Sequence, residues 1–396
     1  MLRGFLILLQ LVVCCGVNAL TQKNGIPQTH TQNQPRVVPS STIVSPPTVA
    51  IINTMPFHQE VFIAIAHAVH SMGSKYMVYA GISWFKTPGI GKSFNLSESI
   101  KFVNEMELNA TEMDILKTYD ILVFPSAEFK HDMDIAFAAC QNIDKLQKII
   151  FILHEPSVMK WGKFTTGLYR YCPFVHLVAL SPHVARKFTE TIRSQGDNRT
   201  VYFYGPLFPI DTAVPYENIP KQFSLQGKLD VTRRDYGSLM SSIDSPQYAW
   251  PSSFKLVILG KPYNLMINTT KSERMEFKMF LPYSEYYTVI QKTIGLLTSF
   301  NSVKYITEKT SSTIGASLIT GTPLVITRRA LASYSFLSAS SVWIQNFNES
   351  DVDAMYRIIS MPNVTAEFKS RYMSLQQDIR AIHVHNKRLM HYLYNL

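Results

Sequence analysis

The sequence predicts an α/β protein made of two Rossmann-like domains that face each other across a cleft. Short apolar segments with strand character alternate with segments of helical periodicity, in two separate series along the chain. A stretch with four prolines between residues 206 and 220 divides the two series. With 396 residues, of which 46% are hydrophobic and 17% charged, the chain can form two cores, expected over residues 48–221 and 222–396.

Residues 1–19 have the pattern of a secretory signal peptide. One cation, Arg3, precedes an apolar run, and small residues up to Ala19 occupy the positions that a signal peptidase reads. Cleavage is the favoured interpretation, although residues 4–20 are just long enough to serve as an uncleaved membrane anchor. Residues 20–47 are rich in Gln, Thr, Ser and Pro without periodicity, which predicts an extended stem or linker. We therefore expect the protein in the secretory pathway, either secreted or in the ER or Golgi lumen.

Glycosylation signals and cysteine usage fit a lumenal or extracellular protein. Two of the four cysteines lie in the signal segment, which leaves Cys140 and Cys172 as the only pair available for a disulfide. A disulfide-rich scaffold is thereby excluded. The sequence contains six N-glycosylation sequons, at Asn95, Asn109, Asn198, Asn268, Asn348 and Asn363.

Charge and motif content exclude several classes of function. The net charge is +10, but Lys and Arg are scattered and no RNA-binding or zinc spacing is present, so no nucleic-acid partner is expected. An anionic small ligand, an anionic glycan or simple solvated basicity each explains this charge. Two Asp-x-Asp triplets, at residues 132–134 and 351–353, fall where helices are predicted to begin, so we interpret them as capping residues and expect no metal. The common hydrolase, protease, P-loop and dinucleotide-binding motifs are absent from the sequence.

The first domain is predicted to open with a strand at residues 49–53, a helix at 60–72 and a second strand at 77–80. Three further apolar runs, at residues 120–125, 149–154 and 176–181, predict more strands of a parallel sheet. His58 follows the first strand, and His154 ends another. Because ligands collect at the carboxyl ends of such strands, both are candidate site residues, although a histidine bonded to the backbone for structural reasons is a competing explanation for His154.

The segment from Val201 to residue 211 is predicted to link the domains. The second domain is expected to open with a strand at residues 223–229 that contains Gly227 and Lys228, followed by Arg233, Arg234 and a helix to about residue 243. A buried strand at 254–260, a Tyr-rich helix at 284–291, a last strand at 342–344 and two amphipathic helices over 351–396 complete the chain.

Residues 304–326 are interpreted as a strand tip, a loop, a helix and the next strand. Ser311, Ser312 and Thr313 can accept hydrogen bonds from the first free N–H groups of this helix. Gly321 is expected to end the helix, and Thr322-Pro323 turns the chain into a buried strand. A helix start of this kind presents unpaired amides and a positive dipole end, which favour a phosphate-bearing ligand.

The order of Glu308, a small-residue helix, Gly321-Thr322-Pro323 and an apolar strand resembles the donor-sugar segment of GT-B glycosyltransferases, in particular the retaining group related to glycogen and sucrose synthases. That family carries a Glu-x7-Glu pair here. Glu308 matches its first member, whereas Ala316 stands where the second, which usually holds the nucleotide ribose, would be. His154-Glu155-Pro156 and Ser181-Pro182-His183-Val184 also match positions of the family, and residues 228–234 match the two cations that clamp the donor diphosphate.

The resemblance implies a metal-independent, retaining glycosyltransferase without a cofactor, which moves a sugar from a nucleotide sugar to a glycan, protein or lipid acceptor. It implies a catalytic contact for Glu308 and His154. His58 is kept as a candidate acceptor contact, although the retaining group places no catalytic histidine there and a loop histidine beside a helix start is most often only a polar neighbour. A membrane partner is expected only if the N-terminal segment stays uncleaved. Two alternatives remain: an inactive relative that binds a glycan or nucleotide sugar, which would explain Ala316, and a two-domain solute-binding protein. The residues assigned to the donor are Gly227, Lys228, Arg233, Arg234, Ser311, Ser312 and Thr313.

Overall fold

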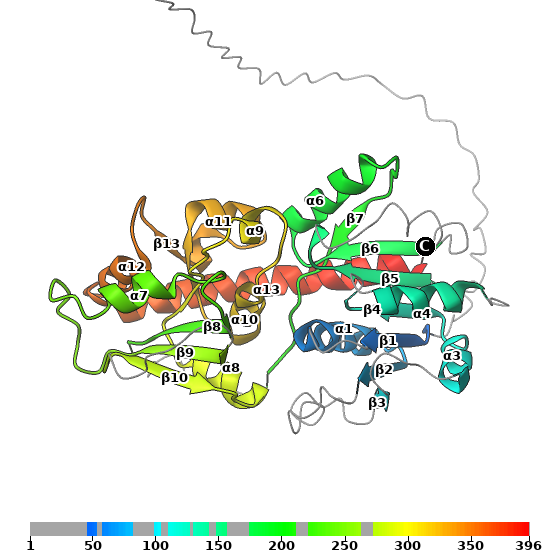
Figure 1. The fold of residues 1–396 in the computed structure, drawn as a ribbon, viewed down its shortest axis with the longest axis horizontal. Coiled ribbons are helices and arrows are strands. Elements are labelled where there is room, and N and C mark those ends of the chain that lie inside the picture. Colours follow the sequence, from blue (N-terminus) through cyan, green and yellow to red (C-terminus); the bar gives the residue numbers. More distant parts are fainter. Residues whose placement is uncertain are drawn as a thin grey trace, which may run out of the picture. The chain divides into compact units, whose positions relative to one another are not determined.

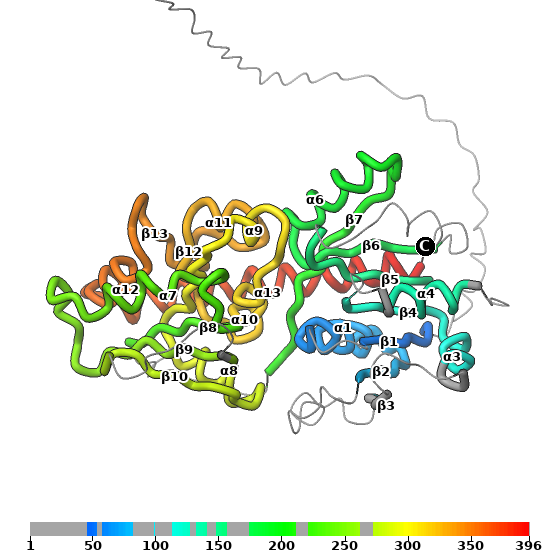
Figure 2. Tube along the Cα trace, in the orientation of Figure 1, coloured from blue at the N-terminus to red at the C-terminus, as the bar shows by residue number. Residues whose placement is uncertain are grey.

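The computed structural model describes residues 46–53, 58–81, 99–103, 110–126, 130–141, 148–156, 174–210, 221–262 and 272–395 (Figures 1 and 2). The predicted signal peptide and nearly all of the predicted stem lie outside these ranges, as do Asn95, Asn109, Asn268 and Cys172. In the described part of the chain, no helix is long and apolar enough to cross a membrane.

The first domain contains a seven-stranded sheet in the order β3-β2-β1-β4-β5-β6-β7, in which every pair of neighbours is parallel. Its inner strand β1 is buried at all five positions and places Val49 between Tyr76 of β2 and Ile121 of β4. This continuous apolar run is what a strand covered on both faces requires. The strands are β1 Val49–Asn53, β2 Tyr76–Gly81, β3 Ile100–Val103, β4 Ile121–Phe124, β5 Lys148–Leu153, β6 Val175–Ala179 and β7 Val201–Phe203.

Amphipathic helices connect these strands. In α6 the buried side chains include Val184, Phe188 and Ile192, which recur every four residues and form one face, and a proline at the first position starts the helix. In α1 the buried side chains occupy most positions from 59 to 69. The described helices of this domain are α1 Gln59–Ser71, α3 Ala110–Leu116, α4 Lys130–Gln141 and α6 Pro182–Arg193.

The second domain contains a six-stranded sheet in the order β10-β9-β8-β11-β12-β13, again parallel throughout. In each sheet the chain starts at an inner strand, adds strands toward one edge and then adds the remaining strands toward the other edge. This is the doubly wound Rossmann order. The prediction of two Rossmann-like domains is confirmed. The strands are β8 Phe223–Leu229, β9 Leu256–Pro262, β10 Met275–Met279, β11 Gly295–Leu297, β12 Leu324–Thr327 and β13 Trp343–Gln345.

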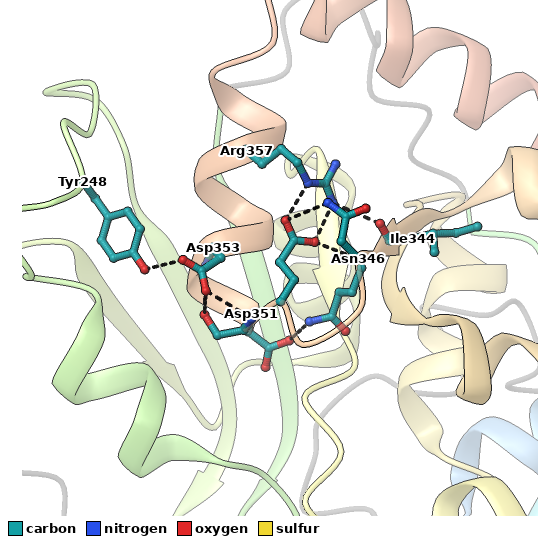
Figure 3. A network of polar contacts seen from close by, with 9 residues as sticks. Tyr248, Ile344, Asn346, Asp351, Asp353 and Arg357 are labelled. Atoms are coloured by element: carbon teal, nitrogen blue, oxygen red, sulfur yellow. Dashed lines mark hydrogen bonds and ion pairs between the residues drawn. The ribbon is translucent and has the colours of Figure 1, made fainter.

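Helix starts in the second domain are fixed by local side chains. At α12 the Ser350 hydroxyl accepts a hydrogen bond from the Asp353 N–H, and the Asp353 carboxylate accepts one from the Ser350 N–H (Figure 3). Asp353 therefore has the capping role expected of it. The helices are α7 Tyr236–Ser242, α8 Tyr283–Gln291, α9 Lys304–Thr307, α10 Ser312–Thr320, α11 Arg328–Ser333, the 3-10 turn η5 Ala339–Ser341, α12 Asp351–Ile359 and α13 Val364–Asn395.

The long helix α13 contacts elements of both domains. Its Asn386 donates a hydrogen bond to the Gly205 carbonyl at 2.7 Å and accepts one from the Gly205 N–H at 3.0 Å. Near its end, the Tyr394 carbonyl accepts a hydrogen bond from Lys148 of β5 at 2.7 Å. One apolar cluster also includes buried residues of both sheets together with α13, so the two domains share part of their core.

Three details of the predicted elements are wrong. Residues 304–307 form the short helix α9 rather than a strand tip, because β11 has already ended at Leu297. Residues 201–203 belong to the first sheet as β7 rather than to the linker. Strand β3 at residues 100–103 was not predicted, since four residues at a sheet edge give too short a pattern to recognise.

Candidate functional site

The predicted donor residues gather at the carboxyl ends of β8 and β11, where the strand order of the second sheet reverses. In a doubly wound sheet this switch point is where ligands bind. Helix α10 starts there. The Ser311 hydroxyl accepts a hydrogen bond from the Thr313 N–H at 3.3 Å, and Gly321 ends the helix with a φ of 70°. Both local features agree with the prediction for this helix.

Arg234 is the most unusual residue of the site, because its guanidinium is buried and forms no ion pair with a carboxylate among the described residues. Only 4% of the residue is exposed, and in the described part of the chain no carboxylate pairs with it. Its guanidinium donates hydrogen bonds to the Thr313 hydroxyl at 2.7 Å and the Ser311 hydroxyl at 3.5 Å. Burial lowers the pKa of Arg234, because the charged guanidinium is disfavoured away from water. An isolated buried ion costs several kcal/mol, so the arrangement favours an anion.

The start of α10 adds to the positive electrostatic potential around Arg234. The guanidinium of Arg234 lies against Thr313, in the first turn of the helix, where the helix dipole is positive. Two aromatic rings hold its flat group, with the guanidinium carbon 5.3 Å from the Phe300 ring centre and 5.4 Å from that of Tyr305. The position of the guanidinium is thus fixed before any ligand arrives.

Gln226 belongs to this site although the sequence did not single it out. It is 2% exposed and donates a hydrogen bond to the Thr313 hydroxyl at 3.0 Å. Its carbonyl oxygen accepts a hydrogen bond from the Tyr286 hydroxyl of α8. An amide side chain in the first part of a predicted buried strand was the available signal, because buried amides need partners.

The other predicted cations, Lys228 and Arg233, lie around Asp230. Arg233 pairs with the Asp230 carboxylate at 3.7 Å, and its side chain is 39% exposed. The pKa of Asp230 is lowered by a hydrogen bond from Thr232 and by the charges of Arg233 and Lys228. Part of their positive charge is therefore already balanced by Asp230. Gly227, just before Lys228, has a φ of 129°, which favours glycine.

Acidic residues of both domains surround the loop before α10. Glu308 lies 3.7 Å from Lys304, and its side chain is 22% exposed. Glu155 of the first domain pairs with Lys304 at 3.2 Å and with Lys309 at 2.6 Å. The loop that carries Glu308 is thus joined to the first domain by ion pairs.

The two predicted histidines of the first domain lie together. Their ring centres are 3.6 Å apart, and His154 Nε2 lies 2.6 Å from the Pro125 carbonyl. Because that carbonyl can only accept, Nε2 carries the proton in this hydrogen bond. The backbone-bonded explanation for His154 is thus supported. His58 caps α1 in the left-handed conformation, with φ 66°.

The electrostatic surroundings of His58 extend into the second domain. Burial lowers the pKa of His58 well below its usual value, and the charges of His154, Lys309 and Arg233 lower it further. Two of these three residues belong to the second domain. One of them, Arg233, is a cation that the sequence assigned to the donor.

His183 and Ser181, at the start of α6, also reach the second domain. The Ser181 hydroxyl lies 2.7 Å from the Thr310 hydroxyl. The ring of His183 lies between two carbonyls, with Nδ1 3.0 Å from that of Ser333 and Nε2 3.3 Å from that of Lys309. These contacts hold the segment before α10 in place, a role that the sequence did not reveal because every partner is more than 125 residues away.

Ala316, which stands where the family has its second Glu, is 4% exposed and belongs to the shared apolar cluster. A carboxylate at this position would be buried among apolar side chains. Any contact with a ribose must therefore come from another residue.

The remaining predicted residues lie away from the donor site. Asn198, Asn348 and Asn363 are exposed, as glycan acceptors must be. Cys140 is disulfide-bonded and 6% exposed. No group of three or more His, Cys, Asp or Glu able to hold a metal ion occurs among the residues that the structure describes.

A hollow of about 460 Å³ lies elsewhere, between α6, β7 and α13, where Arg186, Tyr202 and His385 line it. None of the predicted site residues contributes to its wall. We locate the candidate site by its buried unpaired charge rather than by the size of a hollow.

Comparison with known proteins shows similarity in structure only. No family model matches the chain, and no curated protein matches its sequence. HepE from Anabaena, solved with UDP and glucose, has a TM-score of 0.61 at 13% identity, covering 88% of this chain and 100% of that one. An alpha-glucosyltransferase solved with UDP and a 13-mer DNA has a TM-score of 0.59 at 13% identity, covering 84% and 95%.

The fold is that of the GT-B glycosyltransferases. A glycosyltransferase from Rickettsia africae agrees, with a TM-score of 0.58 at 9% identity, covering 88% of this chain and 99% of that one. At such low identities the similarity establishes the architecture and leaves the activity to be argued from the residues.

Proposed function

We propose that the chain is a glycosyltransferase that uses a nucleotide sugar and binds the donor diphosphate between Arg234 and the start of α10. The observation that carries this proposal is the buried cation of Arg234, which forms no ion pair among the described residues and lies at a helix N-terminus. A diphosphate would balance both positive contributions. UDP complexes of HepE and of the alpha-glucosyltransferase, which share this fold, support the choice of ligand.

The proposed chemistry needs stabilisation of a leaving group. As the bond between sugar and diphosphate breaks, negative charge grows on the diphosphate, and positioned cations lower the energy of that state. Arg234 is fixed for this purpose, while Lys228 and Arg233 add charge nearby. Glu308 would contact the sugar, where positive charge develops. We assign the reaction to the retaining, metal-independent class on the resemblance of this segment to that group.

The two histidines receive different roles in this proposal. His58 lies among the cations of the second domain and would contact the acceptor. His154 binds the Pro125 carbonyl and stacks on His58, so it would position that ring rather than touch the reacting atoms.

Arg234→Gln tests the diphosphate contact. We expect UDP to bind about thirtyfold more weakly, because one charge-assisted hydrogen bond contributes about 2 kcal/mol. Isothermal titration of UDP and GDP measures the change. Arg371→Gln is the matched control, since Arg371 also stacks on a ring, at 4.2 Å from the Trp343 centre, outside the proposed site. Equal UDP affinity in the wild type and Arg234→Gln would exclude this site.

An inactive, nucleotide-sugar-binding protein is the second candidate, favoured by the absence of an acidic residue at Ala316. Incubation with a panel of nucleotide sugars separates the two. Release of nucleoside diphosphate supports an active transferase. The rate of this release should fall in Glu308→Gln, whereas the affinity for UDP should be kept. Binding of UDP without release from any donor supports the inactive protein.

We further propose that the protein enters the secretory pathway. The apolar segment of residues 1–19, the polar stem and the six sequons support this location, as does the exposure of the three sequon asparagines that the structure describes. N-terminal sequencing of mature protein tests it: a start at Leu20 means cleavage, and an intact Met1 means an anchor. A mass unchanged by enzymatic removal of N-glycans would contradict the proposal.

A further inference from the structure

Asp351 is an acidic residue that the start of α12 does not require. The helix is already capped by the reciprocal bonds of Ser350 and Asp353 (Figure 3). Asp351 receives one hydrogen bond within the described residues, from the Gln345 amide at 2.9 Å. Burial raises the pKa of Asp351, so this carboxylate is poorly compensated as it stands.

Ser299, which follows β11, is the second unusual residue here. It is 6% exposed, has a φ of 41°, and its hydroxyl has no hydrogen-bond partner in the described part of the chain. The hydroxyl is near enough to Asp351 to influence the carboxyl without forming a bond of normal geometry. Backbone strain in a non-glycine residue and an unsatisfied buried hydroxyl both recur at ligand-binding positions.

Two more buried polar atoms without partners among the described residues lie close by. They are Nε of Arg234 and the hydroxyl of Tyr236, and each residue is at most 4% exposed. Arg234 pairs with Phe300, the residue after Ser299, in an isolated antiparallel bridge, and its charge lowers the pKa of both Asp351 and Tyr236. Unsatisfied donors and acceptors thus cluster at the carboxyl ends of β8 and β11, beside Asp351.

The order of these groups matches the order of parts in a nucleotide sugar. Arg234 contacts Ser311 and Thr313, which follow Glu308 in the chain, and it pairs with Phe300, the residue after Ser299, in an isolated antiparallel bridge. Ser299 in turn influences Asp351. If the diphosphate binds at Arg234 and the sugar at Glu308, the nucleoside extends toward Asp351. A carboxylate can accept two hydrogen bonds from the vicinal hydroxyls of a ribose.

We propose that Asp351, together with Ser299, binds the ribose hydroxyls of the donor and so restricts the site to ribonucleotides. This contact would replace the one that a glutamate at the Ala316 position makes in the family that the segment resembles. The inference rests on the proposed function and adds the identity of the nucleoside-binding residues. It also assigns a ligand to the strained Ser299.

Discrimination between UDP and 2′-deoxy-UDP tests the inference. The wild type should prefer UDP by about tenfold or more, because the deoxy compound lacks a hydroxyl that donates to a charged acceptor. Asp351→Asn should lose about tenfold in UDP affinity and most of this preference, while its affinity for pyrophosphate stays unchanged. Asn keeps an acceptor for the Gln345 amide, so the fold should be preserved.

Two further variants make the test specific. Asp353→Asn is the matched control on the same helix, and it should lower the melting temperature but keep the preference for UDP. Ser299→Gly removes the hydroxyl, and glycine suits the left-handed backbone at this position. This variant should weaken the binding of UDP more than the binding of 2′-deoxy-UDP. Isothermal titration of the three ligands against each variant provides the comparison.

The outcomes separate this inference from the proposed function. If the wild type binds neither UDP nor pyrophosphate, both are wrong. If the wild type binds UDP and Asp351→Asn keeps the full preference over 2′-deoxy-UDP, only the ribose contact is wrong. A preference that disappears in Asp351→Asn and remains in Asp353→Asn supports the contact.

Discussion

His58 is a buried residue of the first domain whose pKa responds to charges of both domains. Its ring stacks on His154, and its pKa is lowered first by burial and then by His154, Lys309 and Arg233. The cations around His58 disfavour its protonated form, because protonation would add a further positive charge. The same cations would attract an anionic ligand. The same arrangement makes the stability of the protein depend on pH.

We predict that His58→Asn flattens the loss of stability on acidification. In the unfolded chain His58 has a pKa near 6.5, whereas in the folded protein its pKa lies well below that value. The unfolded state therefore binds more protons below pH 6.5, and the contribution of His58 to stability is present above that pH and falls as pH decreases toward the folded pKa. Asn tolerates the left-handed backbone of this position.

Urea unfolding at about pH 7.5, 6 and 5 measures this effect as the difference between the wild type and the variant. His70→Asn, at an exposed position of the same helix, controls for the substitution itself. An identical pH slope in the wild type and His58→Asn would contradict the assigned pKa shift.

At the scale of elements, the paired strands β8 and β9 position the predicted donor cations. Gly227 lies opposite Gly260, and both have left-handed φ values, 129° and 152°. A Cβ added to Gly260 would lie 1.8 Å from the Gly227 carbonyl oxygen, which no side chain can do. The two glycines thus bring the ends of the strands together immediately before Lys228.

Gly260→Ala is expected to destabilise the protein by more than the backbone strain alone, which costs about 1 to 2 kcal/mol. The rest of the loss in stability comes from separating β8 and β9, and this separation should also weaken UDP binding. Gly73→Ala isolates the strain, because Gly73 has a φ of 75° but a Cβ there would meet nothing within 4 Å. Denaturant unfolding of both variants gives the comparison, and equal losses would show that the close approach is unimportant.

Local sequence signals predicted some elements well and others poorly, for physical reasons. Helix α10 was predicted because its cap, Ser311, and its end, Gly321, act within the helix itself. Strand β8 was predicted from its likeness to the strand that precedes the donor cations in the family that the chain resembles, and its first four residues are buried. The helical state of residues 304–307 was missed, since α9 is a single turn that no periodic pattern can reveal.

The candidate site was predictable in position but not in its partners. Arg234 was recognised from its place after a strand, yet its burial against Thr313 and Phe300 depends on residues more than 60 positions away. The relation of Asp351 to Ser299 joins the start of α12 to the segment after β11. Such contacts are set by the topology of the sheet, which a local pattern does not contain.

At the scale of the whole molecule, α13 joins the domains through Asn386. Both hydrogen bonds of this residue go to Gly205, just after the end of the first sheet, and Asn386 is 4% exposed. Since the apolar cluster also includes residues of both sheets, the domains are expected to unfold together.

Asn386→Ala should lower the free energy of unfolding by about 2 kcal/mol, because two buried hydrogen bonds are lost and the Gly205 backbone groups are left without them. Differential scanning calorimetry should show a lower melting temperature. Asn395→Ala, at an exposed position near the end of the same helix, serves as the control. A wild type that melts in two well-separated steps would contradict the shared core.

The contacts of α13 also determine when the first domain can finish folding during synthesis. Residues 49–203 leave the ribosome well before α13, which follows all other described elements. Until then, the apolar surface that α13 covers has no partner, and Gly205 and Lys148 lack their bonds to Asn386 and Tyr394. The nascent first domain should therefore remain a client of chaperones until the final helix docks onto it.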